Sequence, residues 1–356
     1  MTKRSRRIIF YIFLIAFIIL TPSIIFYARG YAFDFEKRII VATGGIYLKT
    51  HPQKADIYIN DKPRGKTTKF IKRLIPKVYR VKIIKQDYHL WQKELTVEPR
   101  LVNKVDNIFL VPFNPKITLV ATESESYSFF EEPYSLLQVT ELIKRKSNYT
   151  ILDINNVNFD VHQEKIYFLS KNNLYYLSWD KENPENSSPS PLLLSNVINY
   201  AIGRNKIIYL EYFTGQIYEL NLNNLESKPI FEQVFPSFNE GKWILSNDKK
   251  KLLCQKNKSV EILWLDRVVN NPISREKGDI EKIDFEEKIN DVIWLPQTDE
   301  HLIVSTDSSI LITELDGRPP RNTINFITTE KPEIKYDASN KILYFLSQNR
   351  LYQTEL

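Results

Sequence analysis

The residue types that carry catalysis and metal binding are sparse in this chain of 356 residues. Its four histidines, His51, His89, His162 and His301, are far apart and show no metal-ligand spacing. No His-Glu-x-x-His, Cys-x-x-Cys, calcium-loop, Gly-x-Ser-x-Gly or glycine-rich phosphate motif occurs. The motifs therefore indicate no catalytic residue, no metal ligand and no cofactor, and we expect a protein that is not an enzyme.

The single cysteine, Cys254, follows two leucines. One cysteine cannot form an intrachain disulfide, so hydrophobic cores must hold the fold together. A cysteine in apolar surroundings is typically a small core residue and not a nucleophile. We therefore expect Cys254 to be part of a core.

Four aspartates recur at predicted turns: Asp160, Asp248, Asp291 and Asp337. Carboxylates at such places commonly accept hydrogen bonds from backbone N–H groups and hold the turn. A carboxylate pair across a channel of the fold could instead act as general acid and base. This alternative, an extracytoplasmic hydrolase or lyase acting on a surface polymer, would be favoured by three or more carboxylate, His or Arg side chains converging at the channel mouth.

Basic residues are concentrated between positions 44 and 112, a stretch with a net charge of +9. The candidate binding residues there are Arg64, Lys66, Lys69, Lys72, Arg73, Lys77, Arg80, Lys82 and Lys85. They form either a solvated β face or a surface for anionic lipid head groups, cell-wall polymer or polysaccharide. A third interpretation docks them on residues 113–356, whose net charge is −8. The pI of 9.0 averages these two parts and does not indicate nucleic acid as a partner.

The elements that would position these basic residues are short strands. Ile57 and Ile59 alternate with Asp56 and Tyr58, the period of a strand with one buried face. Residues 60–63, Asn-Asp-Lys-Pro, supply a turn, because Asn and Asp tolerate left-handed backbone geometry. Further strands are predicted at residues 78–83, 91–97 and 105–110. Residues 44–112 are therefore expected to form a small antiparallel β-sandwich.

This stretch resembles the PEGA domain, a small surface-associated β module of bacteria and archaea. The matching segments are residues 52–55 (Pro-Gln-Lys-Ala), 58–62 (Tyr-Ile-Asn-Asp-Lys), 65–68 (Gly-Lys-Thr-Thr), 74–79 (Leu-Ile-Pro-Lys-Val-Tyr) and 87–88 (Asp-Tyr). Three glycines of the family pattern are replaced, by Lys54, Lys77 and Asp87. Glycine accepts positive φ at little cost, so those turns are expected to differ or to carry mild strain. The resemblance brings no enzymatic residues.

An uncharged stretch from Ile8 to Tyr27 precedes this module. As a helix it would span roughly 30 Å, the thickness of the hydrocarbon core of a bilayer. It exceeds the apolar region of a signal peptide, about 7–15 residues, and no convincing cleavage site follows, so we expect an uncleaved anchor, with a cleaved signal as the alternative. Four basic residues lie before Ile8, which predicts a cytoplasmic stub at 1–7. Residues 28–356 then lie outside the cytoplasm, with 28–43 as a linker.

Beyond residue 113 short strands recur at intervals of roughly 40 to 50 residues, a period typical of propeller blades. The units are expected around residues 126–152, 158–177, 199–220, 243–265, 291–315 and 333–352. Residues 246–252, Ser-Asn-Asp-Lys-Lys-Lys-Leu, are similar to a turn of WD40-like and TolB-type propellers. The last unit stops without an outer strand, and residues 116–120 could supply it and close the ring. Six blades are favoured, five or seven stay open, and a β-sandwich array is the alternative.

Together these patterns predict a mainly β protein with an N-terminal transmembrane helix, a PEGA-like β domain at 44–112 and a degenerate β-propeller at 113–356. The expected function is that of a single-pass cell-membrane protein which binds or scaffolds surface molecules without catalysis. Its partners would be the membrane, anionic lipid head groups, cell-wall polymer or surface proteins. A sensor is a further alternative. It would have to work through a membrane partner, because the seven cytoplasmic residues are too few to transmit a signal.

Overall fold

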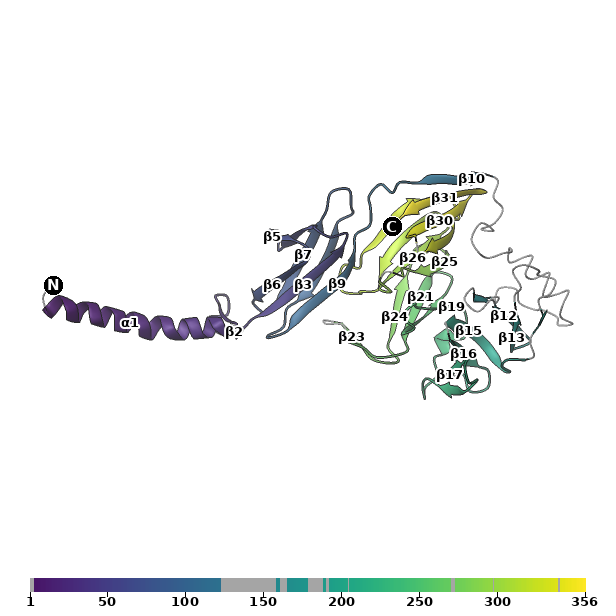
Figure 1. Cartoon of the computed structure of the whole chain (residues 1–356), viewed down its shortest axis with the longest axis horizontal. Helices are drawn as coiled ribbons and strands as arrows, with labels where there is room; N and C mark the ends of the chain where they lie inside the picture. Colours follow the sequence, from purple (N-terminus) through teal and green to yellow (C-terminus); the bar gives the residue numbers. More distant parts are fainter. Residues whose placement is uncertain are drawn as a thin grey trace. The chain divides into compact units, whose positions relative to one another are not determined.

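The computed structural model describes residues 3–122, 158–160, 165–178, 188–189, 192–203, 205–269, 273–296, 298–338 and 340–356 (Figure 1). The fold is mainly β, with 54% of residues in strands and 10% in helices, as predicted. The chain divides into two compact units. The first unit comprises residues up to Phe113 together with 269–274 and 316–322, and the second contains the remainder.

Helix α1 (Lys3–Ala28) begins the first unit and contains the predicted apolar stretch. It is long and apolar enough to cross a membrane, and its apolar window is not buried against any other part of the chain. Pro22 lies inside the helix, and the Ser23 hydroxyl donates to the carbonyl of Ile19 at 3.1 Å. The helix therefore has the length and composition of a membrane anchor or of a signal sequence.

The stretch predicted as a linker, 28–43, contains a β-hairpin. Its strands are β1 (Tyr31–Asp34) and β2 (Ile39–Ala42), which pair antiparallel. The Asp34 carboxylate accepts hydrogen bonds from the backbone N–H groups of Glu36 (2.9 Å) and Lys37 (3.2 Å) and so holds the connecting turn.

Residues 44–112 form the β-sandwich. Its strands are β3 (Gly44–His51), β4 (Asp56–Ile59), β5 (Lys62–Lys66), β6 (Lys69–Leu74), β7 (Val78–Ile84), β8 (Trp91–Thr96) and β9 (Val102–Phe109). They make two sheets, with the strand orders β6-β3-β9 and β5-β4-β7-β8. Ile57 and Ile59 are buried in the core between the sheets, as their alternation predicted.

The sandwich is not wholly antiparallel, which corrects one expectation. Strand β3 pairs antiparallel with β6 but parallel with β9. The chain crosses from β3 to the other sheet at β4 and returns later, so the first and last strands of the sandwich meet running in the same direction. Alternation of apolar and polar residues in the sequence indicates where strands lie, but it does not indicate which strands pair or in which direction.

Two replaced glycines leave a visible mark on the backbone. Lys54 and Asp87 adopt positive φ angles of 63° and 65°, the conformation that glycine accepts most easily. The turn after β4 is left-handed at Asn60 (φ 48°) and Asp61 (φ 63°), as its residue types predicted. Lys77 is not among the residues with positive φ.

The described residues of the second unit contain five four-stranded antiparallel sheets. Their strands are β11 (Asn158–Asp160), β12 (Lys165–Ser170), β13 (Asn173–Ser178) and β14 (Ser188–Pro189); β15 (Val197–Gly203), β16 (Lys206–Glu211), β17 (Ile217–Asn221) and β18 (Ser227–Pro229); β19 (Lys242–Leu245), β20 (Lys251–Gln255), β21 (Ser259–Trp264) and β24 (Ile280–Asp284); β25 (Ile289–Trp294), β26 (His301–Thr306), β27 (Ser309–Glu314) and β28 (Thr323–Thr328); and β29 (Glu333–Asp337), β30 (Ile342–Ser347), β31 (Arg350–Glu355) and β10 (Thr118–Thr122). A short 3-10 helix, η3 (Pro236–Phe238), precedes β19. A two-stranded ribbon, β22 (Val268–Val269) with β23 (Ser274–Arg275), lies between β21 and β24.

The strand order within each sheet is the one expected of a propeller blade. Strand β10 pairs with β31 and supplies the outer strand of the last sheet, as predicted. First strands of neighbouring sheets contact one another, β11 with β15, β15 with β19 and β25 with β29. The unit expected at 126–152 lies outside the described residues, so a total of six blades stays a prediction.

Candidate functional site

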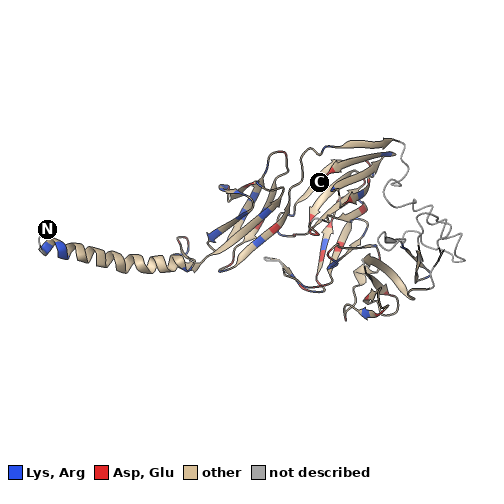
Figure 2. Ribbon diagram, in the orientation of Figure 1, with Lys and Arg blue, Asp and Glu red and all other residues tan. Residues whose placement is uncertain are grey.

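The nine candidate binding residues all lie at exposed or half-buried positions of the β-sandwich. Figure 2 marks lysines and arginines in blue along the ribbon. They do not share one face. Arg80 and Lys82 alternate with buried Val81 and so lie on the outer face of the four-stranded sheet. Lys72 alternates with buried Ile71 on β6, which belongs to the other sheet. The structure therefore divides the predicted surface into at least two parts.

Three of the nine residues form ion pairs. Lys66 lies 3.7 Å from Asp56, Lys77 lies 3.4 Å from Glu36, and Lys82 lies 2.6 Å from Asp61. The hydrogen bond and the charge of Lys82 lower the pKa of Asp61. In each pair at least one side chain is more than half exposed, so each pair contributes little to stability.

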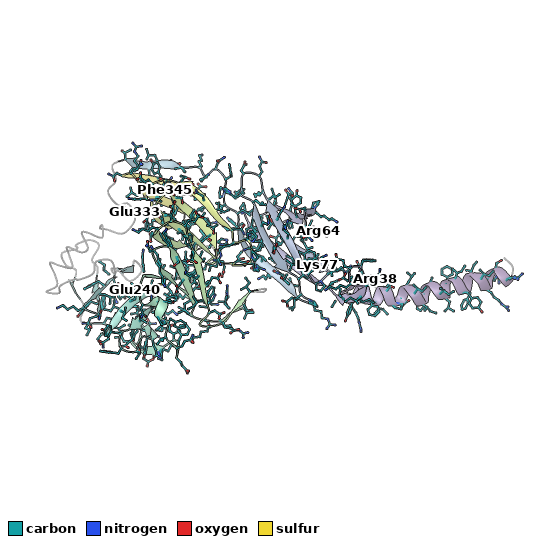
Figure 3. All side chains as sticks on the ribbon, turned by 180° about the vertical axis from the view of Figure 1, so that it is seen from behind. Arg38, Arg64, Lys77, Glu240, Glu333 and Phe345 are labelled. Atoms are coloured by element: carbon teal, nitrogen blue, oxygen red, sulfur yellow. The ribbon has the colours of Figure 1, made fainter. Side chains whose placement is uncertain are left out.

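The other six have no ion pair among the residues that the structure describes. Lys69 donates to the carbonyl of Arg64 at 2.5 Å, and Lys85 donates to the carbonyl of Gln53 at 3.0 Å. Lys72 lies 5.3 Å from the ring centre of Phe70. These contacts orient the side chains without pairing them with a carboxylate. Figure 3 labels Arg64 and Lys77 on this module.

Arg73 has a contact that the sequence did not suggest. Its guanidinium lies 3.5 Å from the ring centre of Tyr27, a residue at the end of α1. A cation over an aromatic face is stabilised by the ring quadrupole. Of the nine residues, Arg73 and Lys77 are thus the two whose contacts lie beside the end of the helix, since Lys77 pairs with Glu36 of the hairpin turn.

A second unexpected feature is the covered edge of β8. Residues 316–322, which connect β27 to β28, belong to the same compact unit as the sandwich. The N–H of Glu94 donates to the carbonyl of Pro319 at 2.8 Å. The Asn322 side chain bonds the backbone of Gln92 twice, accepting from its N–H at 3.3 Å and donating to its carbonyl at 3.1 Å. This segment satisfies backbone groups that an open edge strand would leave unpaired.

Lys93 of the same strand is fully buried, with an exposed fraction of 0%. Its Nζ donates to the carbonyl of Asp316 at 2.8 Å and lies 3.7 Å from the carboxylate of the same residue. Arg318 forms hydrogen bonds to that carboxylate as well. Burial would raise the pKa of Asp316, but the bond from Arg318 and the charge of Lys93 outweigh it, so the pKa lies below its usual value. The nine-residue prediction missed Lys93, although its alternation with Trp91 and Leu95 on β8 is a signal that could have indicated its burial.

Among the described residues of the second unit, a buried lysine lies between two carboxylates. Lys251 is 1% exposed and lies 3.0 Å from Asp248 and 3.2 Å from Glu300. Burial alone would lower the pKa of Lys251, but the charges of Glu300 and Asp248 outweigh it and raise the pKa. Burial raises the pKa of Glu300, although Lys251 opposes this. The ammonium group of Lys251 is thus shared by two carboxylates, Asp248 and Glu300, which lie in different turns.

The carboxylates of this region hold turns, as predicted for Asp248 and Asp337. Asp248 accepts from the N–H of Lys250 at 3.0 Å, and Asp337 accepts from the N–H of Asn340 at 3.1 Å. Asp291 instead pairs with Lys242 at 2.9 Å. Burial raises the pKa of Glu333, and the charge of Asp291 raises it further. The side chain of Asp160 lies outside the described residues.

The remaining reactive residue types are dispersed. His51 stacks on Phe109, His89 contacts Phe113, and burial lowers the pKa of His89. His301 shares a 3.0 Å hydrogen bond with Thr298, and His162 lies outside the described residues. Among the side chains that the structure describes, no three His, Cys, Asp or Glu residues are arranged to hold a metal ion.

Cys254 lies in a core, as its neighbours predicted. Its thiol donates to the carbonyl of Glu240 at 3.0 Å. Burial raises the pKa of this thiol to about 12.

Comparison with known families agrees with the resemblance noted in the sequence. Residues 43–109 match the PEGA domain. The β-sandwich described above is therefore a PEGA domain, and the match ends where β9 ends. A search of curated proteins found no match for the chain.

Solved structures show distant likenesses. One is the extracellular domain of the candidate one component system BT4673 from B. thetaiotaomicron, with 14% identity and a TM-score of 0.35, covering 56% of this chain and 27% of that chain. Another is KlHsv2 with loop 6CD replaced by a Gly-Ser linker, with 10% identity and a TM-score of 0.35, covering 86% and 90%. A third is the gluconolactonase XC5397 from Xanthomonas campestris, with 9% identity and a TM-score of 0.34, covering 55% and 69%. At TM-scores below 0.5 these likenesses establish neither fold nor activity.

Proposed function

We propose that this protein is anchored in a cell membrane by α1 and carries its PEGA domain and its repeated β-sheets outside the cytoplasm. There it acts as a non-catalytic binding or scaffolding protein at the cell surface. The observation that carries the proposal is the direct succession of an apolar, unburied helix ending at Ala28 and a PEGA domain beginning at residue 43. The four basic residues before Ile8 favour retention of the N-terminus in the cytoplasm.

A binding role is supported by how the described charged groups are used. Buried carboxylates of the second unit accept hydrogen bonds from turns or pair with lysines, as Asp299 and Glu261 do. Their partners are those of carboxylates that hold turns and strands, which supports a structural use of these groups. An anionic surface polymer is the ligand class that fits best, because six cations at exposed or half-buried positions of the sandwich carry no carboxylate partner among the described residues.

Binding can be tested with the full chain in nanodiscs of neutral lipid. The probe is a soluble anionic polysaccharide, and the variant combines Lys72→Gln with Arg80→Gln, two exposed positions on different sheets. Affinity should fall roughly tenfold in low salt and the difference should shrink at high salt, because the attraction is screened. A matched control is Lys249→Gln with Lys250→Gln in the second unit, which should leave binding unchanged. Equal binding by wild type and both variants would contradict a role for the sandwich in binding this ligand class.

A further inference from the structure

The hairpin β1–β2 presents large apolar side chains to its surroundings. Phe35 in its turn is 84% exposed, and Phe33, Ile39 and Ile40 are exposed to about half of their surface or slightly less. Phe33 and Ile40 are cross-strand partners, so they lie on the same face of the hairpin. The rings of Phe33 and Phe35 contact each other edge to face at 5.0 Å. Phe33, Phe35 and Ile40 thus form an exposed apolar patch that is costly to leave in water, while Ile39 is the partner of Asp34 on the other face.

The hairpin is tied to the end of α1. Gly30, at a positive φ of 79°, ends the helix, and its carbonyl accepts from both the N–H (2.8 Å) and the hydroxyl (2.7 Å) of Thr43. Tyr31 contacts the ring of Phe26 edge to face and accepts a hydrogen bond from Arg100 at 2.7 Å. The two ends of the hairpin are therefore both held beside the point where the helix stops.

Distance along the chain limits where the hairpin can lie. Only Arg29 and Gly30 separate α1 from β1, a reach of roughly 7–10 Å. The headgroup layer on each side of a bilayer is about 5–8 Å thick, from a ~30 Å core within a total of about 40–45 Å. Because even a fully extended connection reaches little farther than the headgroup layer is thick, the hairpin begins within that layer or at its outer margin.

The charges of the hairpin suit the same location. Arg29, Lys37 and Arg38 are exposed and have no ion pair among the described residues. Of the two acids, Asp34 is buried and holds the turn, while Glu36 is paired with Lys77. Figure 3 labels Arg38 and Lys77 in this region. Basic residues are attracted to anionic lipid headgroups, and aromatic side chains enter the boundary between headgroups and acyl chains, so this combination is typical of segments that bind a membrane surface.

We infer that the hairpin is a second membrane contact, which inserts Phe33, Phe35 and Ile40 into the outer interface of the bilayer that α1 crosses. Lys37 and Arg38 then bind phosphate groups of anionic phospholipids. This inference rests on the proposed crossing of the membrane by α1. Its consequence is that the PEGA domain is held against the membrane surface and does not swing freely on a linker.

The test uses the full chain reconstituted in vesicles of phosphatidylcholine and phosphatidylglycerol. Because Cys254 is buried, a cysteine introduced at the surface can be labelled selectively with an environment-sensitive nitrobenzoxadiazole probe. Three single variants are compared: Phe35→Cys in the hairpin, Ile18→Cys within α1, and Phe213→Cys as a control at an exposed aromatic position of the second unit. Brominated lipids then report which probes touch acyl chains.

The Ile18 and Phe35 probes are expected to lose at least half of their fluorescence with brominated lipid, and the Phe213 probe to lose almost none. Adding Lys37→Gln and Arg38→Gln should reduce quenching at Phe35 at least twofold in anionic vesicles and leave Ile18 unchanged. Quenching at Ile18 with none at Phe35 would overturn the hairpin inference while leaving the anchor intact. A blue-shifted but unquenched Phe35 probe would show protein cover, such as a second copy, and would also overturn it. No quenching at either position would refute the anchor itself, and the hairpin inference with it.

Discussion

The Nζ atom of Lys93 lies 2.8 Å from the carbonyl oxygen of Asp316, although 223 residues separate them in the sequence. The pair ties the segment 316–322 to the edge of the PEGA domain and places a fully buried lysine beside a carboxylate. A buried charge is tolerated only when it is paired and hydrogen-bonded. The contact therefore makes the closure of the β8 edge depend on a few charged groups.

Replacing Lys93 with Met should loosen this edge. Breaking a buried pair by removing one partner costs about 3–5 kcal/mol, and the loss here should fall at or below the low end because Asp316 keeps Arg318. Hydrogen exchange of the Trp91–Thr96 amides measures the change. Lys82→Met is the matched control, since Lys82 pairs with Asp61 on an exposed face and should cost about 0–1 kcal/mol. Equal protection in the two variants would show that the buried pair stabilises the β8 edge no more than an exposed pair does.

The same edge should weaken in acid. The pKa of Asp316 is lower in the folded protein than its ordinary value of 3.8, so its ionised form stabilises the fold. That contribution is complete well above pH 3.8 and is lost as the pH falls through the folded-state pKa. The difference in β8 protection between wild type and Asp316→Asn, corrected for intrinsic exchange, should vanish at low pH. A difference that stays constant down to pH 2 would contradict this assignment.

Restoring a family glycine should stabilise the PEGA domain. Lys54 adopts a φ of 63°, so Lys54→Gly relieves left-handed strain and should gain up to about 1 kcal/mol after the entropic cost of glycine. Lys77→Gly should instead lose about 0.5–1 kcal/mol or more, because Lys77 lacks positive φ and pairs with Glu36. Exchange of the β4 and β7 amides reports both changes. Stabilisation by both glycines, or by neither, would contradict the backbone argument.

Cys254 should be inert in the folded protein. A thiol pKa of about 12 leaves roughly one group in ten thousand ionised at pH 8, and burial also blocks the reagent. Labelling with a maleimide should proceed at least a hundredfold faster in denaturant than in native buffer. Rapid native labelling would mean that the sheet containing β20 opens readily.

Much of this fold could be predicted from residue patterns. Alternation located Ile57 and Ile59 in a core, residue types placed the left-handed turn at Asn60, and the missing outer strand of the last sheet was found in β10. Each of these depends on local periodicity or on a simple need to complete a sheet. The PEGA pattern added specificity, because it orders several turns at fixed spacing.

The features that were missed depend on distant partners. Nothing in the neighbourhood of Lys93 indicates Asp316, and the parallel pairing of β3 with β9 follows from the crossing of the chain between sheets. Residue patterns predict a linker at 28–43 and do not reveal the hairpin at 31–42, because its strands are short and its apolar residues do not face a core. The nine basic residues were grouped by sequence, but the strands that carry them belong to two sheets.

The most direct test of the central claim is membrane fractionation of cells that express the full chain or a chain lacking residues 8–27, followed by protease treatment of intact cells. The full chain should remain with membranes after a high-salt wash and be digested from outside, while the deleted chain should be soluble and protected. A full chain that is protected from the external protease, or that fractionates as a soluble protein, would contradict an anchored protein with its PEGA domain outside the cytoplasm.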